Sequence, residues 1–482
     1  GETFVTRKIT KAAARIKLLP PQAMLARLDS RLDALTGAMR DLPPRQQTLR
    51  RTIDWSHNLL NEDEKQLFAR LAVFRGGRSR EAIETVCGQG MQMDLLEGIE
   101  SLLNKNLLMQ QKGADEEPRF VMLETLHEYA WERLQASDEA RLLRRRHAEY
   151  FTTMAERAEP ELRQSGFTYW MRRLDLEHHN LLLALECSLS DGDTELGLRL
   201  IAALRDFWVM SGRLLEGMQW TERGLSKSRD APPALRARLY TAAGFELSLL
   251  TQQARARQVM EEAVAIAREL DDRLIYAWAL TFRGGASIGQ SQEYEQAVSC
   301  VEEGLALFRA TDCKPGMVQG FCILGELNRA NADDERAQMA YEQALDLTRE
   351  TGEKRHESMM LVNLGFIAMH HGDIDHAQWL FREGLIKALE LAYDRHLIVT
   401  NFVPLAGTIA AKGQPKRAVL LYGAAEALLE LMGVGLQVGD QPEYARDLAF
   451  VRAQLDAATF KTAWAEGRAM TLEQAIAYAL EP

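Results

Sequence analysis

The sequence predicts a mainly α-helical fold in which an array of stacked helical hairpins follows a smaller unit that carries a β-hairpin. The chain has 482 residues, more than one hydrophobic core usually organises, so several units are expected. Leu, Ala, Glu and Arg dominate it, as they do in helix-rich proteins. Two local patterns support this fold: small residues recur at a fixed spacing in the second half, and in the first third two short apolar stretches are separated by a turn.

The fixed spacing is 40 or 41 residues, and three positions of each unit share it. Each unit opens on a glycine or alanine, at Gly244, Gly285, Gly325, Gly365 and Ala406. Twelve residues later each unit has an alanine, at Ala256, Ala297, Ala337, Ala377 and Ala418. Four positions further each has a larger apolar residue, at Met260, Val301, Tyr341, Phe381 and Tyr422. Five units in one phase predict a repeated structural element.

These residue types predict pairs of antiparallel helices. Two helices pack closely only where neither carries bulk at the crossing, and the larger residue one turn on fills the groove beside it. Each hairpin leaves an apolar face open, so neighbouring hairpins stack into an α-solenoid. The pattern is typical of tetratricopeptide repeats, whose period is about 34 residues, with a longer second helix here. Packing, rather than chemistry, accounts for these small and aromatic residues.

The array is predicted to span residues 193–440. Its first, degenerate hairpin covers residues 193–228, with Gly217 and Gly224 at the small positions. Residues 136–192 are expected to form a helical connector before the array, and residues 441–482 a helical cap after it.

Residues 49–135 are predicted to form a winged-helix-like unit, preceded by a helical lead-in over residues 1–48. Asn61 followed by Glu64 is a capping box, which marks the start of a helix. Three helices are expected, over residues 62–74, 79–86 and 94–103. Apolar stretches on both sides of a turn at residues 113–118 then predict a β-hairpin. Three helices followed by a hairpin is the winged-helix plan.

The third of these helices has the wrong charge for DNA. Many winged helices lay this helix against phosphates, which requires Lys and Arg. Here it carries Asp94, Glu97 and Glu100, with only Lys105 to oppose them. We therefore do not expect direct DNA binding by this unit.

The inner, concave face of the array is the expected place for a ligand, because the first helices of stacked hairpins build one continuous surface. Counting in phase gives the candidate residues Arg238, Thr241, Phe245, Trp278, Phe282, Glu326, Arg329, Phe366, Met369 and His370. The expected ligand is a protein or peptide, or a small-molecule inducer. The alternative is that the aromatic members pack between adjacent hairpins and touch no ligand.

Net charge, cysteine content, apolar runs and the catalytic motifs that are absent narrow the classes of function that remain. A net charge of −11 argues against a general polyanion binder. The five cysteines are scattered and odd in number, which fits reduced thiols in a cytoplasmic protein. No apolar run approaches the roughly 20 residues that a membrane helix needs, so no membrane association is expected. No metalloprotease or hydrolase motif occurs, and the adjacent His178 and His179 point about 100° apart on a helix, so no catalytic or metal site is expected.

Several stretches together resemble a known family, the bacterial signal-transduction ATPases with numerous domains. The stretches are LPPRQQTLRRTIDWS (42–56), LLNEDE (59–64), LAVFRGG (71–77), LETLHEYA (123–130) and AWAEGRA (463–469). This family is built from an effector, an NB-ARC nucleotide switch, a winged helix and a tetratricopeptide sensor. The resemblance extends over nearly the whole chain, from about residue 12, and implies a regulatory role; without the ATPase core of the family, the chain itself is not expected to be an enzyme.

The sequence also departs from that family. No G-x-x-x-x-G-K-[ST] phosphate loop occurs, so no cofactor is expected in this chain, and ATP or ADP only in a full-length parent. Met122, Leu123 and Glu124 stand where related switches have Met-His-Asp, and His127, one turn on, is expected at the surface. The resemblance therefore implies a sensor segment that relays ligand binding to a nucleotide switch outside the chain. The alternative is a free-standing tetratricopeptide scaffold for protein–protein interaction.

Overall fold

The structure is a computed structural model that describes residues 49–113, 117–164, 166–190, 193–391, 394–436 and 438–481. The chain divides into two compact units, residues 1–150 with 176–184 and residues 151–175 with 185–482. The lead-in predicted over residues 1–48 lies outside the described residues. Among the described residues, no helix is both long and apolar enough to cross a membrane.

The first unit combines short helices with a small sheet. Its elements are α4 (Leu49–Asn58), α5 (Glu62–Arg70), the 3₁₀ turn η2 (Leu71–Val73), β1 (Gly77–Ser79), α6 (Arg80–Cys87), α7 (Leu95–Asn104), β2 (Met109–Lys112), β3 (Pro118–Val121) and α8 (Glu124–Gln135). The predicted capping box is present: Glu64 N–H donates to the Asn61 side chain, and Asn61 N–H to the Glu64 carboxylate. Phe68, Phe74 and Ile83 are fully buried in its core.

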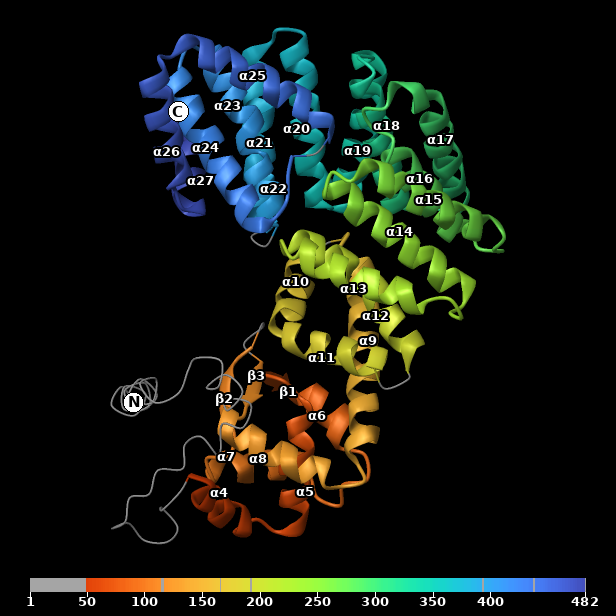
Figure 1. Cartoon of the computed structure of the whole chain (residues 1–482), viewed down its shortest axis with the longest axis vertical. Helices are drawn as coiled ribbons and strands as arrows, with labels where there is room; N and C mark the ends of the chain where they lie inside the picture. The colour runs from red at the N-terminus through yellow and green to blue at the C-terminus, as the bar shows by residue number, and fades with distance from the viewer. Residues whose placement is uncertain are drawn as a thin grey trace, which may run out of the picture. The chain divides into compact units, whose positions relative to one another are not determined.

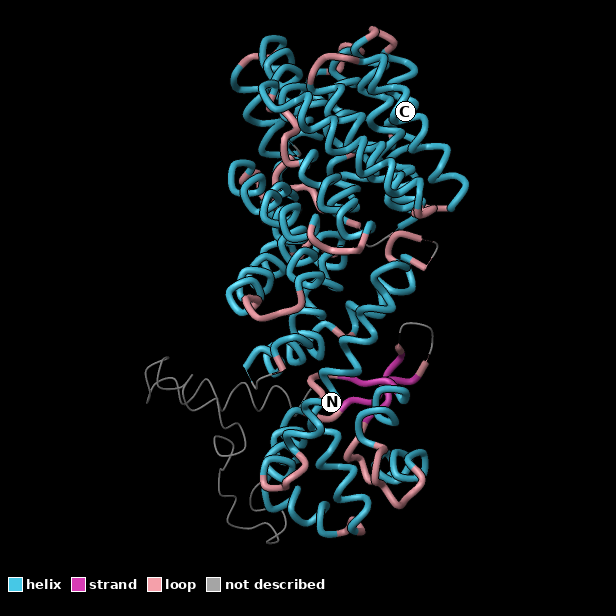
Figure 2. The backbone as a smooth tube through the Cα atoms, turned by 90° about the vertical axis from the view of Figure 1, so that its right-hand side faces the viewer, coloured by secondary structure: helices cyan, strands magenta, loops and turns pink. Residues whose placement is uncertain are grey.

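The predicted hairpin is confirmed, and a third strand joins it. β2 pairs antiparallel with β3, placing Gln110 opposite Phe120. β1, which the sequence pattern did not predict, pairs with the other edge of β3, so the order is β1-β3-β2 (Figure 2). β1 has only three residues, with the buried Arg78 in the middle. It is therefore too short to show the alternation of apolar and polar residues that predicts a strand.

One histidine of this unit departs from expectation. His127 is half-buried rather than at the surface, and its Nε2 lies 2.8 Å from the Phe74 carbonyl oxygen. Burial lowers the pKa of its ring. The periodicity of α8 did not reveal this, because the residue that covers His127 comes from a different element.

The second unit is the array of helical hairpins. α9 (Ala140–Glu161) and α11 (His178–Ser190) run into it from the first unit, with α10 (Phe167–Leu176) between them. The hairpins are α12 (Thr194–Met210) with α13 (Leu214–Lys227), α14 (Pro233–Leu249) with α15 (Gln253–Arg268), α16 (Arg273–Gly285) with α17 (Tyr294–Ala310), α18 (Lys314–Ala330) with α19 (Asp334–Thr351), and α20 (Lys354–His370) with α21 (Ile374–Leu391). Figure 1 follows them from yellow through green to blue. The mainly α, solenoid fold is thus confirmed.

The last hairpin is broken and capped. Its first helix is split into α22 (Arg395–Thr400) and α23 (Phe402–Ala411), which pair with α24 (Pro415–Met432). The 3₁₀ turn η4 (Val438–Asp440) leads into α25 (Gln441–Gln454), α26 (Ala457–Arg468) and α27 (Leu472–Leu480). All three of these helices contact α23 or α24, as a cap would.

The recurring glycines lie where the two helices of a hairpin cross. A Cβ atom at Gly325 would stand 2.2 Å from Tyr341 Cε1, and one at Gly365 2.4 Å from Phe381 Cε1. The larger residue therefore packs directly onto the glycine, rather than beside it. This contact explains why the two positions recur together through the array.

The α16/α17 hairpin uses a different glycine from the one the spacing indicated. A Cβ at Gly284 would lie 2.4 Å from Val301 Cγ2, whereas Gly285 faces Ile323 of the next hairpin at 3.1 Å. The assignment of Gly285 to the crossing was wrong by one residue. Two consecutive glycines made both registers compatible with the sequence.

Candidate ligand-binding site

A cavity of about 110 Å³ opens on the inner side of the array. Its walls come mainly from the first helices of the hairpins, α14, α16, α18, α20 and α22, as expected for a concave face. α12 contacts α22 although four hairpins lie between them, so the array curls back on itself around this space. A single water needs roughly 10–15 Å³, so the cavity can hold more than one water.

Aromatic rings form one apolar wall. Phe245 of α14 and Phe282 of α16 both line the cavity, with ring centroids 5.0 Å apart. Trp278 stacks on Phe282 at 5.6 Å. The Arg205 guanidinium lies 5.6 Å from the Phe245 centroid and 5.4 Å from that of Phe282, so the wall has a cationic cover.

The first turn of α20 brings two basic side chains to the opposite wall. Glu353 caps this helix, accepting hydrogen bonds from the backbone N–H groups of Arg355 and His356. The same carboxylate lies 2.8 Å from His356 Nδ1. Arg355 donates through Nε to Asp394, which is fully buried, at 2.7 Å. These contacts fix both side chains at the cavity wall.

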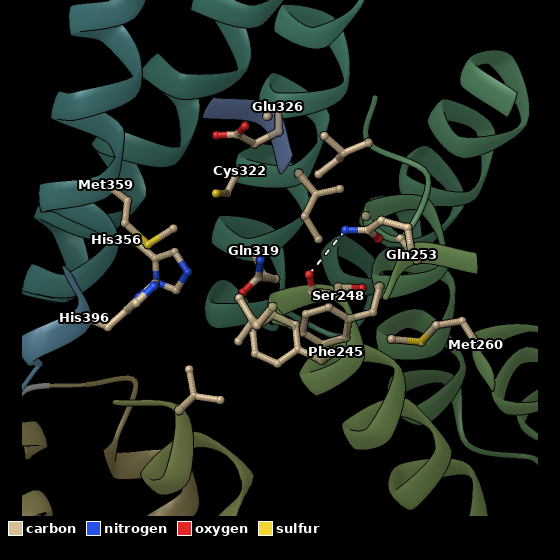
Figure 3. Close-up of a pocket in the computed structure, with 18 of the residues that line it drawn as sticks. Phe245, Ser248, Gln253, Met260, Gln319, Cys322, Glu326, His356, Met359 and His396 are labelled. Carbon is tan, nitrogen blue, oxygen red and sulfur yellow. Dashed lines mark hydrogen bonds between the residues drawn. The ribbon is translucent and has the colours of Figure 1, made fainter. Parts of the chain in front are cut away.

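Two amide and two imidazole groups belong to the polar part of the lining. Figure 3 shows Gln319 in the middle, with His356 and His396 on one side and Gln253 on the other. Gln319 makes no hydrogen bond to a described residue, and Gln253 Oε1 is buried without a partner. Burial lowers the pKa of His396, which is also hydrogen-bonded to the Gly435 backbone.

Residues 434–436 and 439–443, which we call the strap, lie against the inner face. The strap precedes and enters α25. Gly439 lines the cavity, and a Cβ there would stand 2.7 Å from Glu326 Oε2. Only glycine fits this approach without displacing the buried Glu326 carboxylate.

Arg329 of α18 fastens the strap. Its guanidinium pairs with Asp440 at 2.6 Å, with Glu443 at 2.7 Å and with Glu326 of its own helix at 2.9 Å. It also lies 4.8 Å from the ring centroid of Phe366. Burial raises the pKa of Asp440 to about 6, against the opposing pull of Arg329.

The residues that the sequence predicted for the concave face divide into three groups: those that line the cavity or the space beside it, Trp278 in another space, and those engaged within the chain. Phe245, Phe282 and Glu326 line the cavity, and Phe366 with Glu326 lines a smaller adjoining space of about 30 Å³. Trp278 belongs to a separate small space beside Arg163.

The other candidates are engaged within the chain. Arg238 pairs with Glu159 at 2.6 Å, and Thr241 donates to the Ala237 carbonyl in its own helix. Arg329 holds the strap. His370 lies 3.0 Å from Asp334, and its pKa is raised by Glu443, whose carboxylate is 3.6 Å from Nε2, and by Asp334. Met369 is half-buried beside it in α20 and lines none of these spaces.

Sequence reasoning missed Gln319, Arg355, His356 and His396. All four lie in the first half of a first helix, whereas the in-phase count selected residues near the glycines. The Glu353 cap with three basic residues directly after it, Lys354, Arg355 and His356, was the available signal. Among the described residues, no group of three or more His, Cys, Asp or Glu is placed to hold a metal ion.

Comparison with known proteins gives relatives with a regulatory name. The chain is 30% identical over 449 residues to proteins of Mycobacterium tuberculosis and Mycobacterium bovis named "Putative HTH-type transcriptional regulator". The match takes in 89% of this chain and 49% of the relative, so the chain spans about half the length of the curated relatives it matches. No family model matches the chain.

Solved structures with similar helical arrangements share little sequence. One is a signal transduction ATPase with numerous domains with a tetratricopeptide repeat sensor from Pyrococcus horikoshii, at TM-score 0.47, 14% identity, 87% of this chain and 64% of that chain. Another is aspartyl phosphate phosphatase F from Bacillus subtilis, at TM-score 0.45, 14% identity, 83% of this chain and 99% of that chain. In sequence, the chain is similar to about half of a mycobacterial protein named as an HTH-type transcriptional regulator.

Proposed function

We propose that this chain is the sensor segment of a transcriptional regulator, and that its array binds a signal molecule in the cavity between α14 and α22. The observation that carries the proposal is the cavity itself, built from five consecutive first helices and bordered by the strap. The names of the mycobacterial relatives support the regulatory part. The resemblance of the sequence to signal-transduction ATPases supports a relay from the array to a nucleotide switch elsewhere in a longer parent.

A relay needs an element with two arrangements that the ligand biases. The strap is suited to this, because it contacts the cavity through Gly439 and the cap through α25. A ligand that presses on Glu326 or Gly439 changes the fit of the strap against Arg329. We propose no catalysis by this chain, because its sequence contains no hydrolase motif and the nucleophilic side chains of the cavity, Ser248 and Cys322, make no hydrogen bond to a base among the described residues.

The proposal is tested by a substitution that fills the cavity with a large side chain and leaves α14 itself undisturbed. Ser248 lines the cavity, and its hydroxyl donates only to the Gly244 carbonyl of its own helix. Ser248→Trp should block the space. Ser226→Trp is the matched control, because Ser226 is exposed and its hydroxyl bonds its own helix in the same way.

A fragment library is screened against the chain and both variants by ligand-observed NMR. The proposal expects fragments that bind the parent chain and Ser226→Trp but lose binding to Ser248→Trp. If every fragment that binds the parent chain also binds Ser248→Trp with equal affinity, the cavity is not the ligand site.

The alternative, an interaction scaffold, has one observation in its favour. Met339 of α19 and Trp379 of α21 stand in the same phase of successive hairpins, and 50% and 54% of their surfaces are exposed. Large apolar side chains gathered on an outer face are typical of protein-binding surfaces. A partner recovered by pull-down with the whole chain should then be lost from Trp379→Ser and kept by Ser248→Trp.

A further inference from the structure

We propose that the cavity receives a small organic carboxylate with an apolar body. This rests on the proposed function, since it takes the cavity as the ligand site and adds the chemical class of the ligand. The carboxylate is received by Arg355 and Gln319, beside His356, and the body lies against Phe245 and Phe282.

The first argument is the hydrogen-bond capacity left over at one end of the cavity. Arg355 uses Nε for Asp394 and has Nη1 3.5 Å from Met359 Sδ, and Nη2 has no hydrogen bond to a described residue. Its side chain is 12% exposed, so bulk water does not compensate fully. A carboxylate oxygen is the strongest acceptor for such a guanidinium N–H group.

Gln319 adds a second donor for the ligand. Its side-chain amide makes no hydrogen bond to a described residue and lies in the middle of the cavity, with His356 beside it (Figure 3). The His356 ring has Nδ1 2.8 Å from the Glu353 carboxylate, so Nε2 is the ring nitrogen left for a ligand.

The guanidinium group of Arg355 favours an anion over a cation at this end. The Arg163 and Arg205 guanidinium groups both bond Asp206, and the field of Asp206 also reaches Arg355. An ammonium group would face the Arg355 guanidinium without an acceptor, whereas a carboxylate accepts from it.

The rest of the lining asks for an apolar body. Phe245, Phe282, Ile323 and Met260 also line the cavity, and Met260 lies on the side away from His356 (Figure 3). Glu326, the remaining charged group of the lining, is already satisfied, because its two oxygens accept from Arg329 and from Asn363. An aromatic or alkyl chain fills this part with no polar group left unmatched.

The experiment compares four molecules that share one body and differ in the head group: phenylbutyrate, phenylbutyramide, phenylbutanol and phenylbutylamine. Calorimetry with the full chain should give an affinity for the acid at least about tenfold above that for the amide and the alcohol, with no binding of the amine. The head group then decides the affinity, since the body is constant.

Two variants locate the head group. Gln319→Leu removes an amide that bonds no described residue, and should weaken the acid about tenfold while changing the amide by less than about twofold. Arg355→Lys keeps a positive charge beside Asp394 but removes the planar guanidinium group, which can donate two parallel hydrogen bonds. It should therefore also weaken the binding of the acid more than that of the amide. Gln338→Leu is the matched control, because this half-buried glutamine of α19 lies outside the cavity and only bonds Glu342 of its own helix.

The outcomes separate this inference from the proposed function. Equal affinity of acid and amide, with both lost in Ser248→Trp, overturns the carboxylate and leaves the cavity as the ligand site. Binding of the acid that survives Ser248→Trp overturns both. Failure of all four compounds to bind at millimolar concentration overturns the carboxylate, while the fragment screen decides on the cavity independently.

Discussion

Arg329 shows how a single buried charge can organise an inner face. Its side chain is 1% exposed and pairs with three carboxylates, two of which come from the strap. Desolvating an arginine costs several kcal/mol, which only well-placed acidic partners offset. The residue expected to meet a ligand is instead occupied by the chain's own acidic groups, so its role is to hold the strap.

Replacing Arg329 by Met should therefore lower the free energy of unfolding by about 3–5 kcal/mol, because the buried Glu326 is left without a cation and Glu443 keeps only His370, 3.6 Å away. Arg336→Met is the control: its side chain is 67% exposed and pairs only within its helix, so a change within about 0.5 kcal/mol is expected. Urea titrations give both values. Equal midpoints for the two variants would contradict the assigned role.

Glu246 of α14 is a second buried acid, and it has no cation as a partner. Thr221 donates to Oε1 at 3.2 Å, and Oε2 is buried without a partner. Burial raises the pKa of this carboxyl to about 8. The folded chain therefore keeps this proton at neutral pH, where the unfolded chain has lost it.

The sign of the pH dependence follows. Because the folded pKa is the higher one, the stabilisation is complete below the unfolded value of 4.5 and is lost as pH rises towards 8. The free energy of unfolding should fall by on the order of 1 kcal/mol per pH unit in this window. Glu246→Gln should remove this contribution and be more stable than the parent at pH 8. Parallel pH profiles of the two proteins would refute the buried, protonated carboxyl.

At the scale of the element, the helix crossing is the unit of the array. Ala337 of α19 is fully buried at such a crossing, one turn before Tyr341, which packs on Gly325. Added volume here has nowhere to go, because the interior is already close-packed.

Ala337→Leu should cost roughly 1–3 kcal/mol through overpacking. Glu342→Gln, an exposed change in the same helix, should stay within about 0.5 kcal/mol. Denaturant midpoints measured side by side provide the comparison. Should the two shifts be equal, α19 does not present Ala337 to the crossing.

The strap offers a test with a matched pair of glycines. A Cβ at Gly439 would meet Glu326 at 2.7 Å, whereas one at Gly435 would meet nothing closer than 3.8 Å. Gly439→Val should lift the strap and speed amide hydrogen exchange in residues 439–443, and Gly435→Ala should leave it unchanged. Protection of the strap in Gly439→Val equal to that of the parent would show that this close approach does not hold it.

At the scale of the molecule, the charge of the first unit bears on DNA. The basic residue of α7 is engaged, because Lys105 pairs with Glu64 at 2.7 Å, so it is not available to a phosphate. The winged-helix description of this unit stays a prediction, although three helices and the hairpin occur in the predicted order.

The full chain should not bind duplex DNA with sequence selectivity at physiological salt. The reason is the acidic α7, with Asp94, Glu97 and Glu100 against a neutralised Lys105. Gel shifts with a random-sequence duplex pool measure this directly. Enrichment of one sequence from the pool would overturn the expectation.

The sequence by itself determined the repeat, its helices and the cap of α5, because these depend on contacts between residues close in the chain or repeated at a fixed spacing. Local spacing sufficed for Gly325 and Tyr341, which are neighbours within one hairpin. It failed between Gly284 and Gly285, where two registers were equally compatible with the pattern.

Only the tertiary structure decided which side chains of the inner face are paired within the chain and which can meet a ligand. Arg329 meets Asp440 and Glu443 across more than 100 positions of sequence, and Arg355 meets Asp394 from another hairpin. Such pairings depend on how far the array curls, which is the sum of small rotations at every crossing and is written at no single position. The periodicity could therefore place a binding face on the first helices, but not the cavity on it or the strap that borders it.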